Sequence, residues 1–352
     1  MMNNADSRRY GAVRLPAEWE HNGAVLLSWP HEHTDWAPIL DEVTECFVSI
    51  ASAIADEAVV VIVAPDTSVP KGLMSGHPRQ DRFLYLDCPT NDTWARDFGP
   101  ITVRVDGEYA VSDFKFNGWG LKFPADKDNL ITSAMVRSGL IQAPRINRLG
   151  FVLEGGSIES DGEGTLLTTS TCLMSPNRNG DMSRDEIESY LKSAFGLKNV
   201  LWLDHGALAG DDTDSHIDTL ARLAPGDTIV YTSTDDADDE HYAELHAMED
   251  ELKALRTPDG MPYNLIALPL PDAIYDDEGE RLPATYANFL ILDRSILMPS
   301  YGQVKKDLLA SQILRVAFPD HEVRMIDCRP LIKQHGSLHC VTMQLPEEIL
   351  SI

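Results

Sequence analysis

The sequence contains few cysteines, and none of them belongs to a paired motif. Its five cysteines, spread over 352 residues, never stand in a Cys-x-x-Cys arrangement. An odd, scattered set of this kind argues against both a disulfide framework and a zinc knuckle. We therefore expect free thiols and a reducing, cytoplasmic location.

Long hydrophobic runs are also lacking. The longest apolar run, residues 58–64, is far shorter than the roughly 20 residues of a membrane-spanning helix, and it predicts a buried strand. The first ten residues are polar and lack the apolar segment of a secretory signal. These features predict a protein that does not use a membrane.

Positive charge is the third shortage. The chain carries 29 Lys and Arg residues against 56 Asp and Glu residues, a formal net charge of −27. Nucleic-acid-binding proteins need the opposite balance to neutralise phosphates, so the composition excludes that class. Acidity often serves only solubility, but it can also steer small cations into a cleft.

Glycine-rich phosphate-binding loops are missing too, because no Gly-x-Gly-x-x-Gly or Walker sequence follows a predicted strand. Instead, strand-like and helix-like segments alternate along the chain. Helices are predicted over residues 35–56, 183–196, 239–256 and 305–319. Strands are predicted over residues 25–29, 59–63, 101–105, 109–114, 165–169, 228–231, 289–292 and 341–344. The pattern predicts one mixed α/β domain, residues 1–352, with loosely repeated strand–strand–helix–strand units, and an exposed acidic loop over residues 234–240.

Four segments are richer in polar residues and glycine than packing requires. In the first, residues 91–100, two carboxylates (Asp92 and Asp97) stand with Trp94 and Arg96 in a turn before a strand. This predicts a cation site with an aromatic wall and a carboxylate counter-ion. The alternative is an Asp-rich turn with an internal Arg–Asp pair.

The second segment, residues 153–158, places Glu154 before two glycines at the end of an apolar strand. Glycines there allow close approach of a ligand or another backbone. The alternative is a glycine turn with an exposed glutamate.

The third segment, residues 210–219, places His216 and Asp218 two residues apart, so both would face the same side of a strand. A lone histidine is usually structural, but one between acidic residues fits either a divalent-metal site or acid–base catalysis beside a cation-binding carboxylate. Asp211, Asp212 and Asp214 precede it. They are candidates for binding the far end of a cationic substrate or for orienting the loop, or they are solvated caps.

The fourth segment, residues 336–342, holds Cys340 behind a small, flexible loop at the start of a terminal strand. It is either a nucleophile or, as for most free cysteines, a buried structural thiol. Cys46 and Cys172 stand in apolar contexts and are predicted to be structural thiols.

Together and in this order, these four segments closely resemble the signature segments of the agmatine deiminase and bacterial peptidyl-arginine deiminase family, within the guanidino-group-modifying (pentein) superfamily. The resemblance extends from residues 15–20 to Cys340. It implies an α/β fold, a five-bladed propeller of repeated ββαβ-type units around a central active site. The implied activity is hydrolysis of a linear amidine C–N bond, converting agmatine to N-carbamoylputrescine and ammonia in putrescine and polyamine synthesis, without a metal or organic cofactor.

The resemblance also implies residue roles. Cys340 matches the nucleophile, His216 the general acid–base and Glu154 the carboxylate beside it. Asp97 and Asp218 match the pair that grips the guanidinium, and Trp94 matches the aromatic wall. Asp92 and Asp212 are further substrate-binding candidates. The chain departs from the family pattern at His335 and Met343, which affects the pocket rim more than the chemistry.

Chemistry agrees with these roles. A guanidinium is a poor electrophile with five donors, and two carboxylates can hold its carbon in front of a sulfur. The same carboxylates should raise the pKa of the Cys340 thiol. Agmatine is favoured over free arginine because an acidic pocket disfavours a carboxylate. Arg96, which could receive that carboxylate, is expected to be tied up by neighbouring Asp side chains.

Three alternatives remain open. One is an arginine or peptidyl-arginine deiminase on the same fold. Another is a manganese ureohydrolase, because residues 214–218 fit an Asp-x-His-x-Asp ligand pattern, although no second cluster of this kind is present. The third is a non-catalytic pentein that binds a partner. A homodimer or higher homo-oligomer is compatible with the sequence.

Overall fold

The computed structural model describes residues 12–20 and 22–352. The polar start, used above to argue against a secretory signal, therefore lies outside the described residues. Within them the fold is mixed α/β, as predicted. No helix of the described part has an apolar stretch long enough to cross a bilayer.

The described strands form five small sheets. Two sheets have four strands, which in spatial order are β1 (Val13–Arg14), β5 (Ile101–Val105), β6 (Glu108–Lys115) and β7 (Arg145–Val152) in one, and β17 (Thr342–Pro346), β2 (Gly23–Ser28), β3 (Val59–Ala64) and β4 (Phe83–Asp87) in the other. Two three-stranded sheets are β10 (Asn199–Leu203), β9 (Thr165–Thr169) and β8 (Ile158–Ser160), and β11 (Ala221–Ala224), β12 (Thr228–Ser233) and β13 (Asn264–Pro269). The last three-stranded sheet is β14 (Leu290–Ile291), β15 (Ser295–Ser300) and β16 (Glu322–Asp327).

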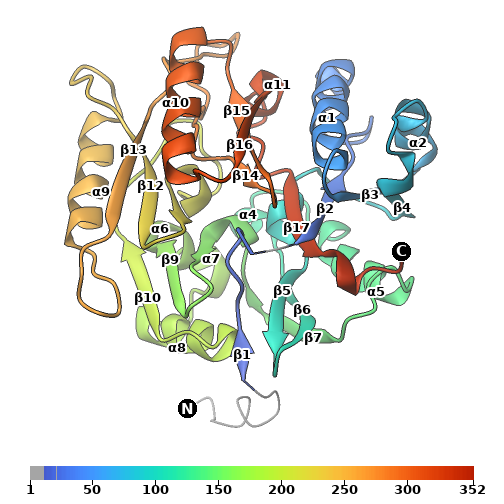
Figure 1. The fold of residues 1–352 in the computed structure, drawn as a ribbon, viewed down its shortest axis with the longest axis horizontal. Helices are drawn as coiled ribbons and strands as arrows, with labels where there is room; N and C mark the ends of the chain where they lie inside the picture. The colour runs from blue at the N-terminus through green and yellow to red at the C-terminus, as the bar shows by residue number, and fades with distance from the viewer. Residues whose placement is uncertain (1–11, 21) are drawn as a thin grey trace.

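The five sheets share one connectivity. Each has an antiparallel pair followed by a parallel pair, and a helix lies in the crossover between the parallel strands, as the geometry of parallel pairing requires. The crossover helices are α5 (Ile131–Arg137), α8 (Arg184–Phe195), α9 (Tyr242–Ala254), α10 (Val304–Ala317) and α1 (Leu40–Ala55). Figure 1 shows α1, α8, α9 and α10 at the periphery, outside the strands. The predicted strand–strand–helix–strand recurrence is thus present.

The remaining helical segments are short. They are α2 (Ser68–Met74), α3 (Ala95–Phe98), α4 (Gly118–Leu121), α6 (Ser170–Leu173), α7 (Pro176–Asn179), α11 (Arg329–Ile332) and the 3-10 turns η1 (Ala37–Ile39), η2 (Gln80–Arg82), η3 (Asp128–Leu130), η4 (Gly155–Ser157), η5 (Ile217–Thr219) and η6 (Glu347–Ile349). Three of them (α3, η4 and η5) carry residues from the polar segments singled out in the sequence.

Local sequence explains the regular elements. All six residues of β3 are buried, as expected for a strand covered on both faces. Helix α8 begins with a complete Ser183–Glu186 capping box and ends at Gly196 in the left-handed conformation, both as the sequence predicts. An N-terminal and a C-terminal strand meet where β17 pairs antiparallel with β2. This pairing brings the segment around Cys340 into contact with the N-terminal sheet.

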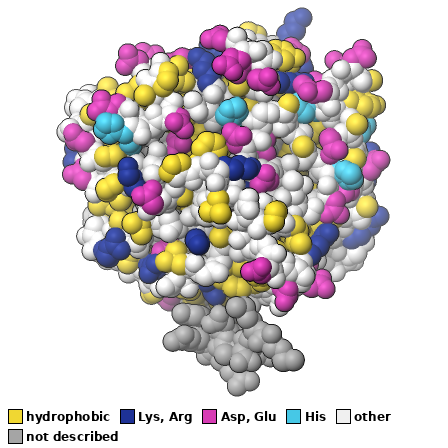
Figure 2. All heavy atoms as spheres, turned by 180° about the vertical axis from the view of Figure 1, so that it is seen from behind, with side chains coloured by type: hydrophobic (Ala, Val, Ile, Leu, Met, Phe, Trp, Pro, Cys, Tyr) yellow, Lys and Arg dark blue, Asp and Glu magenta, His cyan; other side chains and the backbone are white. Residues whose placement is uncertain are grey.

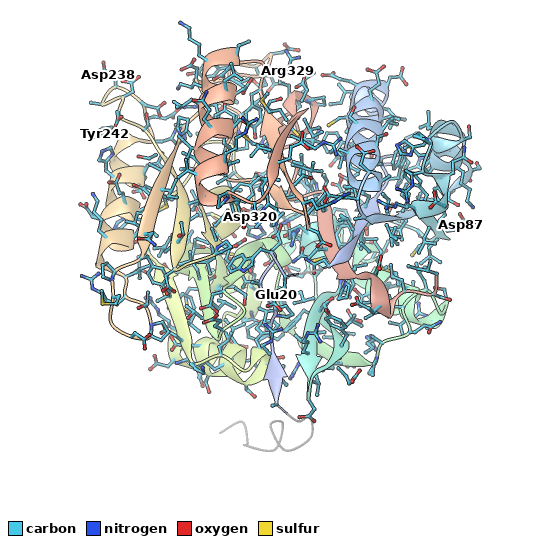
Figure 3. All side chains as sticks on the ribbon, in the orientation of Figure 1. Glu20, Asp87, Asp238, Tyr242, Asp320 and Arg329 are labelled. Carbon is cyan, nitrogen blue, oxygen red and sulfur yellow. The ribbon has the colours of Figure 1, made fainter. Side chains whose placement is uncertain are left out.

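Charged side chains of both signs are mixed on the face drawn in Figure 2, where Asp and Glu lie among Lys and Arg. The acidic stretch 234–240 is mostly exposed. Figure 3 places Asp238 and Tyr242, at the start of α9, at the outer edge of the molecule. This agrees with the predicted solvated loop.

Two local predictions were wrong. His216 and Asp218 do not share a strand, because His216 caps the 3-10 turn η5, which contains Asp218. Cys340 lies in a turn that ends before β17 begins at Thr342. In both places the chain leaves regular structure, so the functional side chains are presented by turns.

Candidate active site

Cys340 lines a cavity of about 140 Å³ that is rich in carboxylates. The cavity is bounded by Asp35, Asp92, Trp94, Asp97, Trp119, Phe123, Asp211, Asp212, Thr213, Thr219, Gln334, His335, Gly336 and Cys340. These residues include five aspartates and, in the part of the chain that the structure describes, no lysine or arginine. The cavity therefore suits a small cation.

The Cys340 thiol is buried beside a carboxylate and an amide. Its Sγ lies 3.8 Å from Asp218 Oδ2 and 3.4 Å from Asn288 Oδ1, and the latter oxygen also accepts hydrogen bonds from the backbone N–H groups of His339 and Cys340. Burial, followed by repulsion from Asp218 and Asp97, raises the pKa of the Cys340 thiol well above its usual value. This direction is the one predicted from the sequence.

Asp97 is fixed by two N–H donors. Its Oδ1 accepts from the backbone of Gly156 at 2.9 Å, and its Oδ2 accepts from Trp119 Nε1 at 2.9 Å. Burial, followed by repulsion from Asp218, raises the pKa of Asp97 well above its usual value, and the two donors oppose this only in part. Asp97 therefore tends to hold a proton in the free protein.

Asp218 has a different environment. Burial acts to raise its pKa, but the hydrogen bond and charge of His339, whose Nδ1 lies 2.7 Å from Asp218 Oδ2, bring the pKa below its usual value. Its Oδ1 has no hydrogen-bond partner among the described residues. Asp218 therefore offers an ionised, unengaged oxygen beside Cys340.

His216 is fully buried, and neither ring nitrogen has a hydrogen-bond partner within the described chain. Its Nδ1 lies 3.6 Å from Asp97 Oδ1. Burial lowers the pKa of His216 to about 3, although Asp218 acts in the opposite direction. His216 is therefore neutral in the free protein at neutral pH, with both nitrogens available.

Glu154 lies beside His216, as the resemblance implies, but its bonded partner is Arg178. Both Glu154 oxygens accept from Arg178 Nε, at 3.0 and 2.9 Å. Arg178 Nη1 also donates to Asp214 Oδ2 at 2.5 Å. The sequence analysis missed Arg178, whose only signal is a cation inside the Pro- and Asn-rich turn that forms α7.

The three aspartates before His216 separate into two roles. Asp211 accepts from the backbone N–H groups of Thr213 and Ser215, and Asp214 is bound by Lys122 and Arg178, so both orient the loop. The Asp212 carboxylate remains half-exposed at the cavity, 3.9 Å from His335 Nε2. Of these three, Asp212 is the one able to bind a ligand directly.

Asp92 is largely engaged by its surroundings. Its Oδ1 accepts from Trp36 Nε1 at 3.0 Å and from the backbone N–H of Thr93 at 2.8 Å. Burial raises the pKa of Asp92 to about 6. It lines the cavity as predicted, but these bonds leave it less available than Asp212.

Two indoles line the cavity. Trp94, expected from the sequence, packs so closely on Gly336 that a Cβ at that position would lie 2.2 Å from the Trp94 ring. Trp119 was missed. Its backbone has a φ of 53°, and it stands between Gly118 and Gly120 in the left-handed region, so the aromatic residue flanked by glycines was the available signal.

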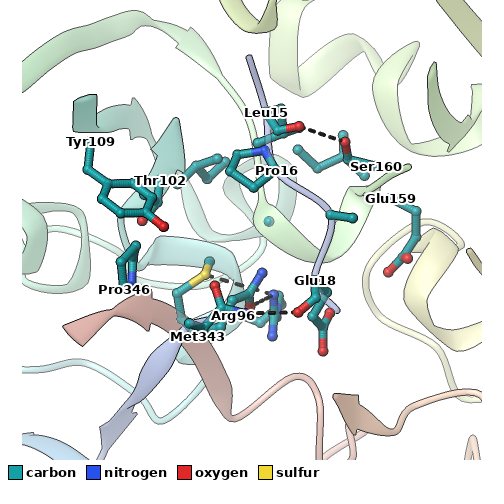
Figure 4. Close-up of a pocket in the computed structure, with 16 residues that line it drawn as sticks. Leu15, Pro16, Glu18, Arg96, Thr102, Tyr109, Glu159, Ser160, Met343 and Pro346 are labelled. Atoms are coloured by element: carbon teal, nitrogen blue, oxygen red, sulfur yellow. Dashed lines mark hydrogen bonds between the residues drawn. The ribbon is translucent and has the colours of Figure 1, made fainter. Parts of the chain in front are cut away.

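Arg96 corrects another expectation. It is not tied up by neighbouring aspartates. Its Nη1 donates to Gln344 Oε1 at 2.5 Å and lies 3.8 Å from Met343 Sδ. Figure 4 shows Arg96, Met343 and Glu18 at a second cavity, of about 60 Å³, which Cys340 does not line. Arg96 thus belongs to a different cavity and does not offer its guanidinium to the one at Cys340.

Two buried groups bring metal-type ligand atoms within 4.8 Å of one another, namely Glu154, Cys172 and His216, and Glu18, Glu159 and His339. Each group already contains a guanidinium bonded to its carboxylates, Arg178 in the first and Arg222 in the second. A divalent cation would have to displace that charge. The donor sets therefore fit ion-pair clusters better than metal centres.

Comparisons with known proteins agree with this geometry. The family described as Porphyromonas-type peptidyl-arginine deiminase matches residues 14–346. A Legionella pneumophila protein named "Putative agmatine deiminase" is 34% identical over 353 residues, covering 98% of this chain and 97% of that protein. A crystal structure named "Putative Arginine Deiminase", from Porphyromonas gingivalis, is 52% identical with a TM-score of 0.92, covering 96% of this chain and 100% of that one.

A structure of a C. jejuni agmatine deiminase with substrate bound is 36% identical to this chain, with a TM-score of 0.88 over 95% of this chain and 96% of that one. These relatives share the mixed α/β fold over nearly the whole length. The chain belongs to the Porphyromonas-type peptidyl-arginine deiminase family and is a hydrolase that acts on amidine carbon–nitrogen bonds.

Proposed function

We propose that this protein is an agmatine deiminase, which hydrolyses agmatine to N-carbamoylputrescine and ammonia through a covalent intermediate on Cys340. The observation that carries the proposal is the composition of the cavity. A buried thiol shares it with five aspartates, and in the described residues no lysine or arginine lines it. Nucleophile and cation-binding groups therefore stand together.

The first half-reaction forms the covalent intermediate. The guanidinium binds Asp97 and Asp218 by charge-assisted hydrogen bonds, which offsets their repulsion of a Cys340 thiolate. The thiol proton passes to His216, which is neutral in the free protein. The thiolate adds to the guanidinium carbon, and His216 gives the proton to the departing nitrogen, so ammonia leaves and a thiouronium remains on sulfur.

The second half-reaction releases the product. Neutral His216 takes a proton from water, and the hydroxide adds to the thiouronium carbon. The C–S bond then breaks, the ureido product leaves, and His216 returns its proton to the Cys340 thiolate. The hydroxyl proton of the ureido product goes to solvent, where the ammonia released earlier takes it up as ammonium. Glu154, held by Arg178, supports His216 electrostatically at this step.

Agmatine fits this cavity better than arginine. The butyl chain of agmatine ends in an ammonium, which can pair with the half-exposed carboxylate of Asp212. The α-carboxylate of arginine would meet aspartates, since Arg96 is bonded to Gln344 at the other cavity. Relatives differ in their named substrate, arginine for the Porphyromonas gingivalis protein and agmatine for the C. jejuni enzyme, so the local charge decides the proposal.

The test is ammonia release from agmatine, free arginine and an arginine peptide under identical conditions. We expect kcat/KM to favour agmatine by at least about 100-fold, the scale of losing one ion pair and facing one repulsion. A ratio near one, or one that favours arginine, would refute the substrate assignment. Release of urea, lost on chelation and restored by manganese, would instead assign a ureohydrolase.

We also propose that residues 1–352 form one catalytic domain, with the five sheets as blades of a propeller around the active site. The shared connectivity of the sheets and the pairing of β17 with β2 support this arrangement. A cytoplasmic location is proposed as well, because all five cysteines are free thiols.

A further inference from the structure

His339, the residue directly before Cys340, bridges two buried carboxylates from distant parts of the chain. Its Nδ1 lies 2.7 Å from Asp218 Oδ2, and its Nε2 lies 2.8 Å from Glu18 Oε2. The side chain is 1% exposed. A carboxylate oxygen only accepts, so Nδ1 donates its hydrogen bond to Asp218, whereas Nε2 lies between Glu18 and, at 3.1 Å, the donor Nη2 of Arg222. A buried N–H donor therefore stands directly behind Asp218.

Glu18 is a fixed anion at the other end of this bridge. It accepts from Arg222 Nη2 at 2.7 Å and from the backbone N–H of Ile291 at 2.9 Å. Burial acts to raise its pKa, but the charges of His339, Arg222 and Arg96 hold the pKa of Glu18 well below its usual value. Arg222 also binds Glu159. Figure 4 shows Glu18, Arg96 and Glu159 around the second cavity. The His339 ring is thus held from behind by an ion-pair cluster.

The bridge makes the two guanidinium-binding carboxylates unequal. Asp218 accepts the hydrogen bond of His339 Nδ1, and His339, His216 and Arg222 all favour its anionic form. Asp97 accepts from the neutral donors Trp119 and Gly156 and lies 3.6 Å from His216 Nδ1, while the carboxylates of Asp218 and Glu154 repel its charge. These surroundings push the pKa values of the two carboxyl groups apart. Before substrate binds they favour an ionised Asp218 and a protonated Asp97.

We propose that His339 is a positioning residue of the deiminase reaction: its bond to Asp218 determines which of the two guanidinium-binding carboxylates is ionised before substrate arrives, and it aims that carboxylate at the carbon that Cys340 attacks. The inference rests on the proposed function, because it takes Asp97 and Asp218 as the guanidinium clamp. The entering cation pairs first with Asp218. The O–H bond of Asp97 then breaks, its proton goes to solvent, and the second ion pair forms.

The number of protons released when agmatine binds measures this difference in protonation directly. Agmatine is titrated by calorimetry into the Cys340→Ala protein, in buffers of different ionisation enthalpy, with His339 intact or replaced. His339→Asn places its amide nitrogen near the position of Nδ1 and can keep the bond to Asp218. His339→Gln places its amide near Nε2 and loses that bond. Glu18→Gln leaves His339 in place and removes the anion that holds both His339 and Arg222.

With His339 intact, binding should release up to one proton, from Asp97. The Gln variant should release more, because Asp218 is then also partly protonated, and it should bind agmatine about ten-fold more weakly at neutral pH. With Cys340 restored, the acidic limb of the pH profile of kcat/KM for the His339→Gln enzyme should move up by roughly one pH unit. The His339→Asn variant should stay closer to the protein with His339 intact, and Glu18→Gln should fall between the Asn and Gln variants. A purely structural role would lower the melting temperature without moving either readout.

His241→Asn is the matched control. His241 is also buried and bonded to an aspartate, Asp239, outside the site. Its loss should leave proton release unchanged. If wild type deiminates agmatine while the Gln variant keeps the parental proton release and acidic limb, the inference is overturned alone. If wild type releases no ammonia from any guanidino compound, the proposed function fails and the inference with it.

Discussion

The backbone N–H of Gly156 donates a 2.9 Å hydrogen bond to Asp97 Oδ1, and only glycine fits at that position. A Cβ there would lie 2.7 Å from His216 Nδ1 and 2.8 Å from Asp97 Oδ1. These contacts are shorter than real Cβ atoms tolerate, so His216 and Asp97 can approach each other only across a glycine. This close approach explains why glycine stands at position 156, the third residue of the Glu154–Gly155–Gly156 sequence.

Gly156→Ala should therefore lower kcat/KM for agmatine by at least about 100-fold, because a displacement of about 1 Å from the reactive geometry has an effect of that size. Gly150→Ala is the control, since a Cβ at Gly150 meets nothing within 4 Å. Steady-state kinetics on both variants provide the check. An active Gly156→Ala enzyme would mean that the close approach is not needed for turnover.

Cys340→Ala should abolish turnover and leave the thermal melt nearly unchanged, because the proposed mechanism makes the thiol the nucleophile and its removal opens little space. Cys172→Ala, at a fully buried thiol outside the cavity, should affect stability more than activity. Ammonia release and melting curves of both variants distinguish the roles. More than a few per cent of residual activity in the Cys340 variant would contradict the covalent mechanism.

The pH dependence of the Cys340 thiol gives a separate prediction. Burial and two carboxylates raise its pKa in the free protein, so the thiolate forms only at alkaline pH. A bound guanidinium offsets the repulsion and should move ionisation to lower pH. Thiolate ultraviolet absorbance, as wild type minus Cys340→Ala with and without guanidinium, records the shift. No shift, or one to higher pH, would refute the electrostatic coupling.

Asp97→Asn should separate function from stability. It removes a charge from the clamp, so affinity and rate should fall together. The folded-state pKa of Asp97 is raised, so the native protein holds a proton that the unfolded chain loses above its ordinary pKa, near 4. The contribution of Asp97 to the stability of the wild-type protein therefore weakens as pH rises through that value. The melting temperature of the variant, relative to wild type, should rise between about pH 4 and pH 7. A constant difference across that range would contradict the raised pKa.

Arg178 is expected to matter for stability through Glu154. Arg178→Met leaves a fully buried carboxylate without its cationic partner, which should cost about 3–5 kcal/mol at neutral pH. Adding Glu154→Gln should recover part of that loss, because the unpaired charge is then gone. Arg184→Met is the control, since its pair with Asp204 is exposed and worth less than about 1 kcal/mol. Denaturant unfolding of wild type, Arg178→Met, Glu154→Gln, the double variant and the control makes the comparison, and additive losses in the double variant would rule out coupling.

The sequence predicted the elements whose signals are local. Apolar periodicity located α1, and the Ser183–Glu186 pattern located the start of α8, because both reflect contacts within a few residues. Trp94, Asp97 and Cys340 were found because each lies in a short segment with an unusual composition. The structure places all three at one cavity.

What the sequence could not predict depends on contacts between distant segments. Arg178 reaches Glu154 from 24 residues away, and His339 reaches Glu18 from 321 residues away. Nothing in the positions of Arg178 and His339 along the sequence indicates these partners. The direction of the Arg96 side chain could not be predicted from the sequence either, since Arg96 lines the second cavity and the next residue, Asp97, lines the cavity at Cys340. Side chains of adjacent residues in a short turn can point to opposite sides, and only the packed structure decides which.

The Asp212 carboxylate is the group that should distinguish agmatine from simpler guanidines. It is half-exposed at the cavity, and its Oδ2 lies 3.9 Å from His335 Nε2, so it can pair with the far ammonium of agmatine. Asp212→Asn should lower kcat/KM for agmatine by about ten-fold, mainly through KM, because this ion pair is made equally in the ground and transition states. Butylguanidine, which has the same chain without the amine, should react equally well with both proteins. The comparison of the two substrates on the two enzymes isolates the pairwise interaction from any general damage to the loop. An equal loss for both substrates would show that Asp212 shapes the loop, as Asp211 and Asp214 do, and that the ammonium is bound elsewhere.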